Sequence, residues 1–147
     1  MKRRTLLQAL PLATFLPPSL LAASRDSDNP DQGSTKVYEL RVYQAARGKL
    51  AELLARFREH TTMLFDKHGM KNVAYWTAID EPRKSNTLIY ILEHPSREAA
   101  ATNWKSFQDD PEWKSVRDKS EANGKLVENV ESTFLTLTDF SPPVRLK

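Results

Sequence analysis

The chain has 147 residues, of which 39% are hydrophobic, no cysteine, and a formal net charge of +3. This length suits one domain with a self-supporting core, and the lack of cysteine excludes disulfides, thiolate metal sites and thiol nucleophiles. The positive excess comes entirely from Lys2, Arg3 and Arg4, because no acidic residue occurs in residues 1–24. Without that segment the formal net charge is zero, which leaves no electrostatic case for nucleic-acid binding.

Residues 1–24 have the composition of a signal peptide. A basic head precedes a run of almost wholly apolar or small residues, which ends in the small side chains of Ala22-Ala23-Ser24. A membrane anchor is the alternative, but the run is barely long enough to span a bilayer and contains helix-breaking prolines. We therefore expect a periplasmic or secreted protein with no stable membrane span after cleavage. Arg3-Arg4 resembles the twin-arginine export signal, and both that route and general secretion are open.

Two further segments are expected to lie outside the folded domain. Residues 25–35 are polar and rich in Asp, Asn and Ser, which predicts a flexible linker. At the other end, Ser141-Pro142-Pro143 stops the last strand, so residues 141–147 are predicted to form a tail. The domain itself is expected to span residues 36–140.

The first half of this domain predicts a strand, a helix and a hairpin. Val37–Tyr43 alternates β-branched and aromatic residues with polar ones, which is typical of a strand. From Leu50 to Leu64 apolar residues recur at helical spacing, and Lys67-His68-Gly69 is a helix stop. Two β-rich runs, Val73–Ile79 and Thr87–Glu93, flank a turn-like segment and should pair antiparallel.

The second half predicts a helical region and a final strand. Ser96 can cap one helix, and Asp110-Pro111 can begin a second, short one. Val127–Thr138 then alternates as a long strand. The resulting order of strand, helix, strand, strand, helix, strand predicts an α+β, ferredoxin-like fold, in which a four-stranded antiparallel sheet carries helices on one face.

One strand predicts a partner for the other face of this sheet. Leu88–Leu92 is apolar at every position, so both faces of that strand require cover. Helices can cover only one face. The simplest second cover is another copy of the sheet, which predicts a homodimer with an isologous interface.

Five short motifs follow one another along residues 37–140. They are Tyr38-Glu39-Leu40-Arg41-Val42-Tyr43, Gly48-Lys49-Leu50, His68-Gly69-Met70, Tyr75-Trp76 and Asp109-Asp110-Pro111-Glu112-Trp113. In this order they resemble the NIPSNAP family of the dimeric α+β barrel superfamily. The resemblance implies a homodimer whose two sheets enclose a cavity. The wider superfamily contains cofactor-independent monooxygenases, haem-degrading enzymes, peroxidases, isomerases and dehydratases, whereas NIPSNAP proteins have no settled activity, so the resemblance does not indicate which reaction, if any, the protein catalyses.

Charged residues of the first strand form one candidate site. Glu39, Arg41 and Tyr43 share a face by alternation. We expect this face to be opposite the one bearing Leu40 and Val42, which should meet the helices, so the charges would line a cavity between two sheets. Arg41 could then orient an anionic group, and Glu39 could accept a proton. The alternative is that Glu39 and Arg41 pair as structural ions.

The histidines are isolated from one another along the chain. His60 borders the apolar face of the first helix, where it could act as a general base or bind haem, or be an ordinary boundary residue. His68, in the last helical turn, suits a capping or dipole role, and His94 precedes Pro95 at a strand end. No histidine pair has the spacing of a metal-ligand set, so we expect no metal site and no resident cofactor.

Aromatic residues provide candidate walls for an apolar pocket, with core packing as the alternative. They are Tyr75, Trp76, Tyr90, Trp104 and Trp113.

These features favour an exported homodimer that binds a small, largely apolar molecule between sheet and helices, with Arg41 orienting an anionic group and His60 nearby. One alternative is a cofactor-independent monooxygenase or proton-transfer enzyme, of isomerase or dehydratase type, with His60 or Glu39 as its base. Two others are a haem binder that uses His60 or His94, and a structural interaction module.

Overall fold

The computed structural model describes residues 36–144. The expected signal peptide, the linker and residues 145–147 lie outside the described residues. None of the helices within residues 36–144 combines the length and apolar character that a membrane crossing requires. The elements run in the order β1 (Val37–Ala45), α1 (Leu50–Arg56), the π-helix η1 (Phe57–Thr61), α2 (Thr62–Lys67), β2 (Lys71–Thr77), the 3-10 helix η2 (Arg83–Ser85), β3 (Thr87–His94), α3 (Arg97–Asp109), α4 (Pro111–Ser120) and β4 (Val127–Leu135).

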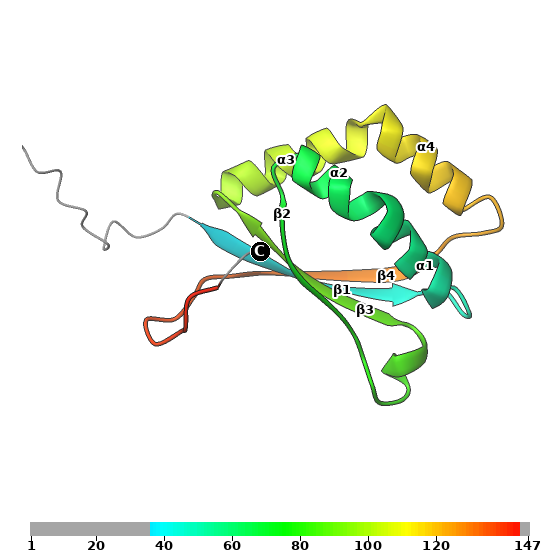
Figure 1. Cartoon of the computed structure of the whole chain (residues 1–147), viewed down its shortest axis with the longest axis horizontal. Coiled ribbons are helices and arrows are strands. Elements are labelled where there is room, and N and C mark those ends of the chain that lie inside the picture. Colours follow the sequence, from blue (N-terminus) through cyan, green and yellow to red (C-terminus); the bar gives the residue numbers. More distant parts are fainter. Residues whose placement is uncertain (1–35, 145–147) are drawn as a thin grey trace, which may run out of the picture. The chain divides into compact units, whose positions relative to one another are not determined.

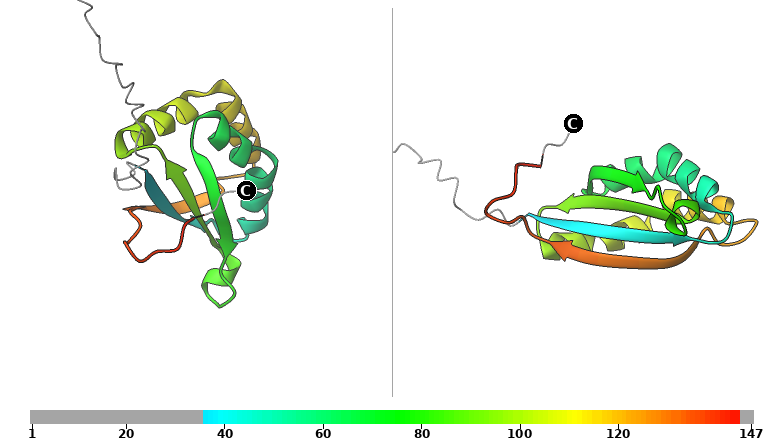
Figure 2. Two further views of the ribbon diagram at one scale, coloured as in Figure 1. Left: turned by 60° about the vertical axis from the view of Figure 1, so that its left-hand side comes forward. Right: turned by 90° about the horizontal axis from the view of Figure 1, so that it is seen from below.

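The four strands form one antiparallel sheet in the order β2-β3-β1-β4. The helices lie together on one side of this sheet (Figure 1). Seen from below in the right-hand view of Figure 2, the strands lie in front of the helices. This arrangement confirms the predicted ferredoxin-like α+β fold.

Local signals set the helix ends as predicted. The hydroxyl of Ser96 accepts a hydrogen bond from the Ala99 backbone amide at 3.0 Å, and the Asp110 carboxylate accepts one from the Glu112 amide at 2.7 Å. Each bond satisfies a backbone donor that the first turn of a helix leaves free. Gly69, just after α2, has a φ of 74°, which suits the left-handed residue that closes a helix.

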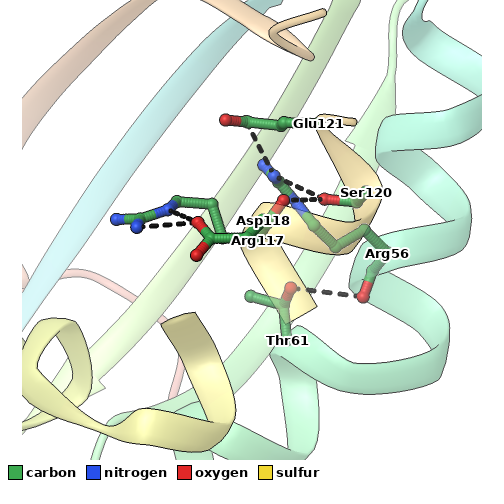
Figure 3. A network of polar contacts seen from close by, with 6 residues as sticks. All are labelled: Arg56, Thr61, Arg117, Asp118, Ser120 and Glu121. Atoms are coloured by element: carbon green, nitrogen blue, oxygen red, sulfur yellow. Dashed lines mark hydrogen bonds and ion pairs between the residues drawn. The ribbon is translucent and has the colours of Figure 1, made fainter. Parts of the chain in front are cut away.

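The π-helical turn inside the first helical segment was not predicted. Here η1 separates α1 from α2, and the hydroxyl of Thr61 donates to the backbone carbonyl of Arg56 at 3.2 Å (Figure 3). Apolar spacing of three or four residues is compatible with either helix type over so short a stretch, so the pattern alone did not reveal the turn.

Several strand boundaries differ from the prediction, among them those of the second and the last strand. The second strand begins at Lys71 and ends at Thr77, which lies opposite Leu88 near the start of β3. The last strand ends at Leu135, which lies opposite Tyr38 near the start of β1. In both cases the strand stops where its neighbour stops, because residues beyond that point have no backbone to pair with.

The core lies between the sheet and the helices, and an aromatic group forms its centre. Phe65 is 1% exposed, and its ring lies 5.9 Å from that of Tyr90 and 5.0 Å from that of Phe107, centroid to centroid. Leu88, Tyr90 and Leu92 of β3 are all buried on this side.

The other face of the sheet is also apolar, as predicted. Ile89 and Ile91 of β3 alternate with the core residues and lie opposite Val42 and Leu40 of β1. All four side chains are only partly buried. Trp76 lies opposite Ile89 on the same face and is 48% exposed. We call this surface of Leu40, Val42, Trp76, Ile89 and Ile91 the open face.

The predicted orientation of β1 is wrong. Arg41 lies opposite Tyr90, and Tyr43 lies opposite Leu88, so both share the face of buried core residues. The ring of Tyr43 also lies 5.7 Å from that of Phe57 in η1. Glu39, Arg41 and Tyr43 therefore face the helices, while Leu40 and Val42 lie on the open face. The expectation failed because it assumed that charged residues avoid the side of the helices.

Candidate functional site

The carboxylate of Glu39 is the centre of a buried polar cluster between the sheet and α3. Glu39 is 1% exposed. Its Oε1 accepts hydrogen bonds from Arg41 Nη1 at 2.7 Å and from Ser132 Oγ at 2.6 Å. Its Oε2 accepts one from Trp104 Nε1 at 2.6 Å and lies 3.0 Å from His94 Nε2. We call these five residues the Glu39 cluster; it joins β1, β3, β4 and α3.

The environment keeps Glu39 ionised. Burial alone would raise the pKa of this carboxyl group, because the charged form loses its hydration. Hydrogen bonds from the four partners outweigh that effect and lower the pKa of Glu39 to about 2. Since an ionised carboxylate has no hydrogen to donate, the hydrogen in the contact with His94 belongs to His94 Nε2. Glu39 is thus an acceptor with too little proton affinity for a general base near pH 7.

Arg41 is the member of this cluster that combines charge with some access to solvent. Its guanidinium carbon lies 4.2 Å from the ring centroid of Trp104 and 5.4 Å from that of Tyr43, and both contacts are favourable for a cation. Nη2 also donates to the Tyr43 hydroxyl at 3.4 Å. The side chain of Arg41 remains 16% exposed, while that of Glu39 is 2% exposed.

Three buried polar atoms in and beside the cluster have no hydrogen-bond partner within residues 36–144. They are Arg41 Nε, Tyr90 Oη and His94 Nδ1. Burial, followed by the neighbouring Tyr43, raises the pKa of Tyr90 well above its ordinary value, so its hydroxyl stays protonated. Arg41 and Tyr90 are opposite each other in the β1–β3 pair. A buried donor that has no protein partner is a place where an ordered water or a ligand oxygen can bind.

Sequence comparison places the chain in a family. The model of a family described as NIPSNAP matches residues 38–142. The chain belongs to the NIPSNAP family. No curated protein matches it. The residues that carried the resemblance in the sequence thus identified the family correctly.

Solved structures show the same fold. A NIPSNAP-like domain protein from Burkholderia xenovorans is 18% identical, with a TM-score of 0.65 over 76% of this chain and 93% of that one. A NIPSNAP family protein from Agrobacterium tumefaciens is 23% identical, with a TM-score of 0.63 over 73% of this chain and 97% of that one. At this identity the likeness speaks to the fold alone.

The structure brings together most of the residues that the sequence of this NIPSNAP protein singled out. Glu39, Arg41 and Trp104 are in direct contact in the Glu39 cluster, and Tyr43 and Tyr90 adjoin it. Glu39 and Arg41 form an ion pair with each other at 2.7 Å.

Other predicted residues lie apart from the cluster. Tyr75 stacks on Tyr90 at 5.3 Å between centroids, on the core side, whereas Trp76 is on the open face. His60 is exposed and lines a groove between η1 and α4. No contact links His60 to the Glu39 cluster in the described part of this NIPSNAP chain.

Sequence reasoning missed two members of the Glu39 cluster. His94, considered only as a haem ligand, is fully buried, and Ser132 was not considered. The alternation of the last strand offered one signal, because Ser132 shares a strand face with Val130 and Phe134 and faces Arg41 once the pairing of β1 and β4 is known. The pairing itself is not visible in the local sequence.

His68 lies at the end of α2, but its side chain contacts residues of the next two helices and does not cap α2. Its Nδ1 lies 2.8 Å from Ser106 Oγ, and its Nε2 lies 2.7 Å from Asp110 Oδ2. Hydrogen bonds from Lys67 and His68 lower the pKa of Asp110. This contact ties the end of α2 to the N-terminal cap of α4. Among residues 36–144, no group of three or more acidic or histidine side chains is placed to hold a metal ion.

Proposed function

We propose that this NIPSNAP protein is an exported homodimer that binds a small, largely apolar molecule against Arg41, between the sheet and the helices. The observation that carries the proposal is the pair of buried, unsatisfied donors, Arg41 Nε and Tyr90 Oη. Leaving a buried donor unpaired costs about 1–3 kcal/mol, so a ligand that supplies an acceptor gains that energy on binding.

The surroundings of Arg41 favour a ligand with an aromatic or apolar body and an anionic or carbonyl oxygen. Tyr43 and Trp104 offer aromatic surface beside the guanidinium. Glu39 already neutralises Arg41 through a 2.7 Å ion pair, which reduces the attraction for a full negative charge. A neutral carbonyl oxygen is therefore the acceptor that suits this site best.

The open face supports the homodimer. Its five side chains form an apolar surface on two neighbouring strand pairs, and Trp76 is 48% exposed. Exposed apolar patches of this kind are typical of interaction sites. A second copy can cover the face by the same residues, as an isologous dimer requires. The signal-like residues 1–24 support export.

The enzyme alternative loses one of its bases. A carboxyl group with a pKa of about 2 is ionised but takes up protons too weakly for proton abstraction near neutral pH. His60 lines a different groove. Binding is therefore the function that this site supports best.

Replacing Tyr90 by phenylalanine tests the ligand site. The variant loses a hydroxyl that has no partner in the described structure, so the free energy of unfolding of ligand-free protein should stay constant or rise by about 1 kcal/mol. The fraction of protein that retains a small molecule through purification should fall about tenfold, since one hydrogen bond is worth roughly that factor. Denaturant unfolding and native mass spectrometry measure the two quantities.

Tyr75→Phe is the matched control. The hydroxyl of Tyr75 donates to the Asn72 side chain, so its loss should cost about 1 kcal/mol of stability and leave the retained molecule in place. If Tyr90→Phe instead lowers stability as Tyr75→Phe does and does not affect retention, the Tyr90 hydroxyl has an internal partner such as a water, and the site as described here is wrong.

A further inference from the structure

A second site lies on the helical layer, away from the Glu39 cluster. A groove of about 440 Å³ runs between η1 and α4. This volume is within the range of small-molecule sites. One wall includes Arg56, Glu59 and His60, and the other includes Val116, Lys119 and Ser120. Glu59 and His60 belong to the π-helical turn η1, whereas Arg56 is the last residue of α1. π-Helical turns occur often at functional sites.

Arg56 is a buried cation of this groove with an unmet donor. Its side chain is 4% exposed, and its Nη1 is 3.0 Å from Glu121 Oε1 and 3.2 Å from Ser120 Oγ (Figure 3). Its guanidinium carbon lies 5.2 Å from the ring centroid of Trp113. Arg56 Nε is also buried, and it has no hydrogen-bond partner within residues 36–144. A buried guanidinium that is anchored through Nη1 and leaves the N–H of Nε unmet is a preformed donor for an oxygen ligand.

Two other charged side chains of the groove, Glu59 and Lys119, have no ion-pair partner among the described residues. Glu52 pairs with Lys49, and Arg56 pairs with Glu121. Glu59 and Lys119, from opposite walls, form no ion pair with each other or with any other described residue. A plain anion would meet the carboxylates of Glu52 and Glu59, and a plain cation would meet Lys119 and Arg56. A molecule with one positive and one negative group suits both walls at once.

We propose that this groove binds a small zwitterion that carries one ammonium and one carboxylate group, as amino acids do. Its carboxylate lies toward Lys119 and Arg56 Nε, and its ammonium lies toward Glu59. His60 lies beside Glu59 at the rim, and the apolar lining of Ala55 and Val116 receives the rest of the molecule. This site is independent of the one proposed at Arg41.

Calorimetric titration of the purified protein with each standard amino acid tests the proposal. For any amino acid that binds, the carboxylic acid lacking the amine and the amine lacking the carboxylate are titrated in parallel. We expect at least one amino acid to bind with a Kd below about 10 mM, and both analogues to bind about tenfold more weakly or less. No binding by any amino acid, or equal binding by an analogue, would overturn the proposal.

Two variants assign the binding to this groove. Lys119→Met and Glu59→Gln should each weaken binding of the zwitterion about threefold to fivefold, because each removes one ion pair with an exposed side chain. Lys114→Met, on the same helix but outside the groove, and Glu81→Gln, in the exposed turn after β2, are the matched controls and should bind as the wild type does. Unchanged binding in both groove variants would contradict the assignment. Tyr90→Phe should leave this binding unaffected, which separates the test from that of the Arg41 site.

Discussion

Replacing Glu39 by glutamine is expected to lower the free energy of unfolding by about 3 kcal/mol, since removing one partner of a buried ion pair typically costs that much. The glutamine keeps the volume but loses the charge that pairs with Arg41. It also turns one acceptor oxygen into an amide nitrogen, which faces the donors that the carboxylate satisfied. Urea unfolding monitored by circular dichroism measures the change. Glu81→Gln, on an exposed turn, should change stability by less than about 0.5 kcal/mol.

The same variant should flatten the acid dependence of stability. The pKa of Glu39 is lowered from 4.5 to about 2 in the folded protein. A lowered folded-state pKa contributes stability above the unfolded value, and this contribution is lost as the pH falls through the window from about 5 to 2. At the usual free energy per pKa unit, the loss is on the order of 3 kcal/mol. If the free energy of unfolding falls by the same amount in wild type and in Glu39→Gln over this window, the hydrogen bonds of the Glu39 cluster do not lower the pKa of Glu39.

If the proposed homodimer pairs through the open face, replacing Ile91 by lysine should give a monomer. Ile91 lies opposite Leu40 and Ala74 on the open face, where a second copy would bury it. A charge buried without a partner in a symmetric interface occurs twice and costs several kcal/mol each time. Within a single subunit the side chain is only partly buried, so the fold should survive. Light scattering gives the mass, and circular dichroism checks the fold.

Met63→Lys is the control for this substitution. Met63 is 63% exposed on α2, on the side of the helices, so a new charge there should leave the mass unchanged. A dimeric Ile91→Lys protein, or a monomeric wild type at micromolar concentration, would contradict pairing through the open face.

The fold was predictable because its signals are local. Ser96 and Asp110-Pro111 mark helix starts through side chains that bond their own first turn, and Gly69 ends a helix by its φ. The alternating segments identified the strands, and together with the helices they gave the order strand, helix, strand, strand, helix, strand. The end of β4 was not predictable, because it is set by where β1 begins and not by the residues after Leu135.

The site was only partly predictable, for reasons that its residues show. Glu39, Arg41 and Trp104 could be singled out as charged or aromatic residues on regular elements. The face of β1 that they occupy could not be predicted, because that strand carries apolar or aromatic residues on both faces. The Glu39–Arg41 ion pair also offsets the usual penalty for burying a charge.

The other partners of Glu39 were not predictable because they are far from it in the sequence. His94 lies 55 residues from Glu39 along the chain, and Ser132 lies 93 residues from it. Nothing in the local sequence around either residue indicates a carboxylate partner. The groove beside Arg56 was not predictable either. Over so short a stretch, the spacing of apolar residues does not distinguish a π-helical turn from an α-helical one.

Native mass spectrometry of the purified protein tests the proposed ligand site and the proposed homodimer in one experiment. It reads the number of subunits and any small molecule that stays bound. A dimer that carries a defined additional mass, lost in Tyr90→Phe and kept in Tyr75→Phe, is the predicted result. A monomer, or a dimer that is empty in both wild type and variants, would contradict the account of a ligand held between sheet and helices.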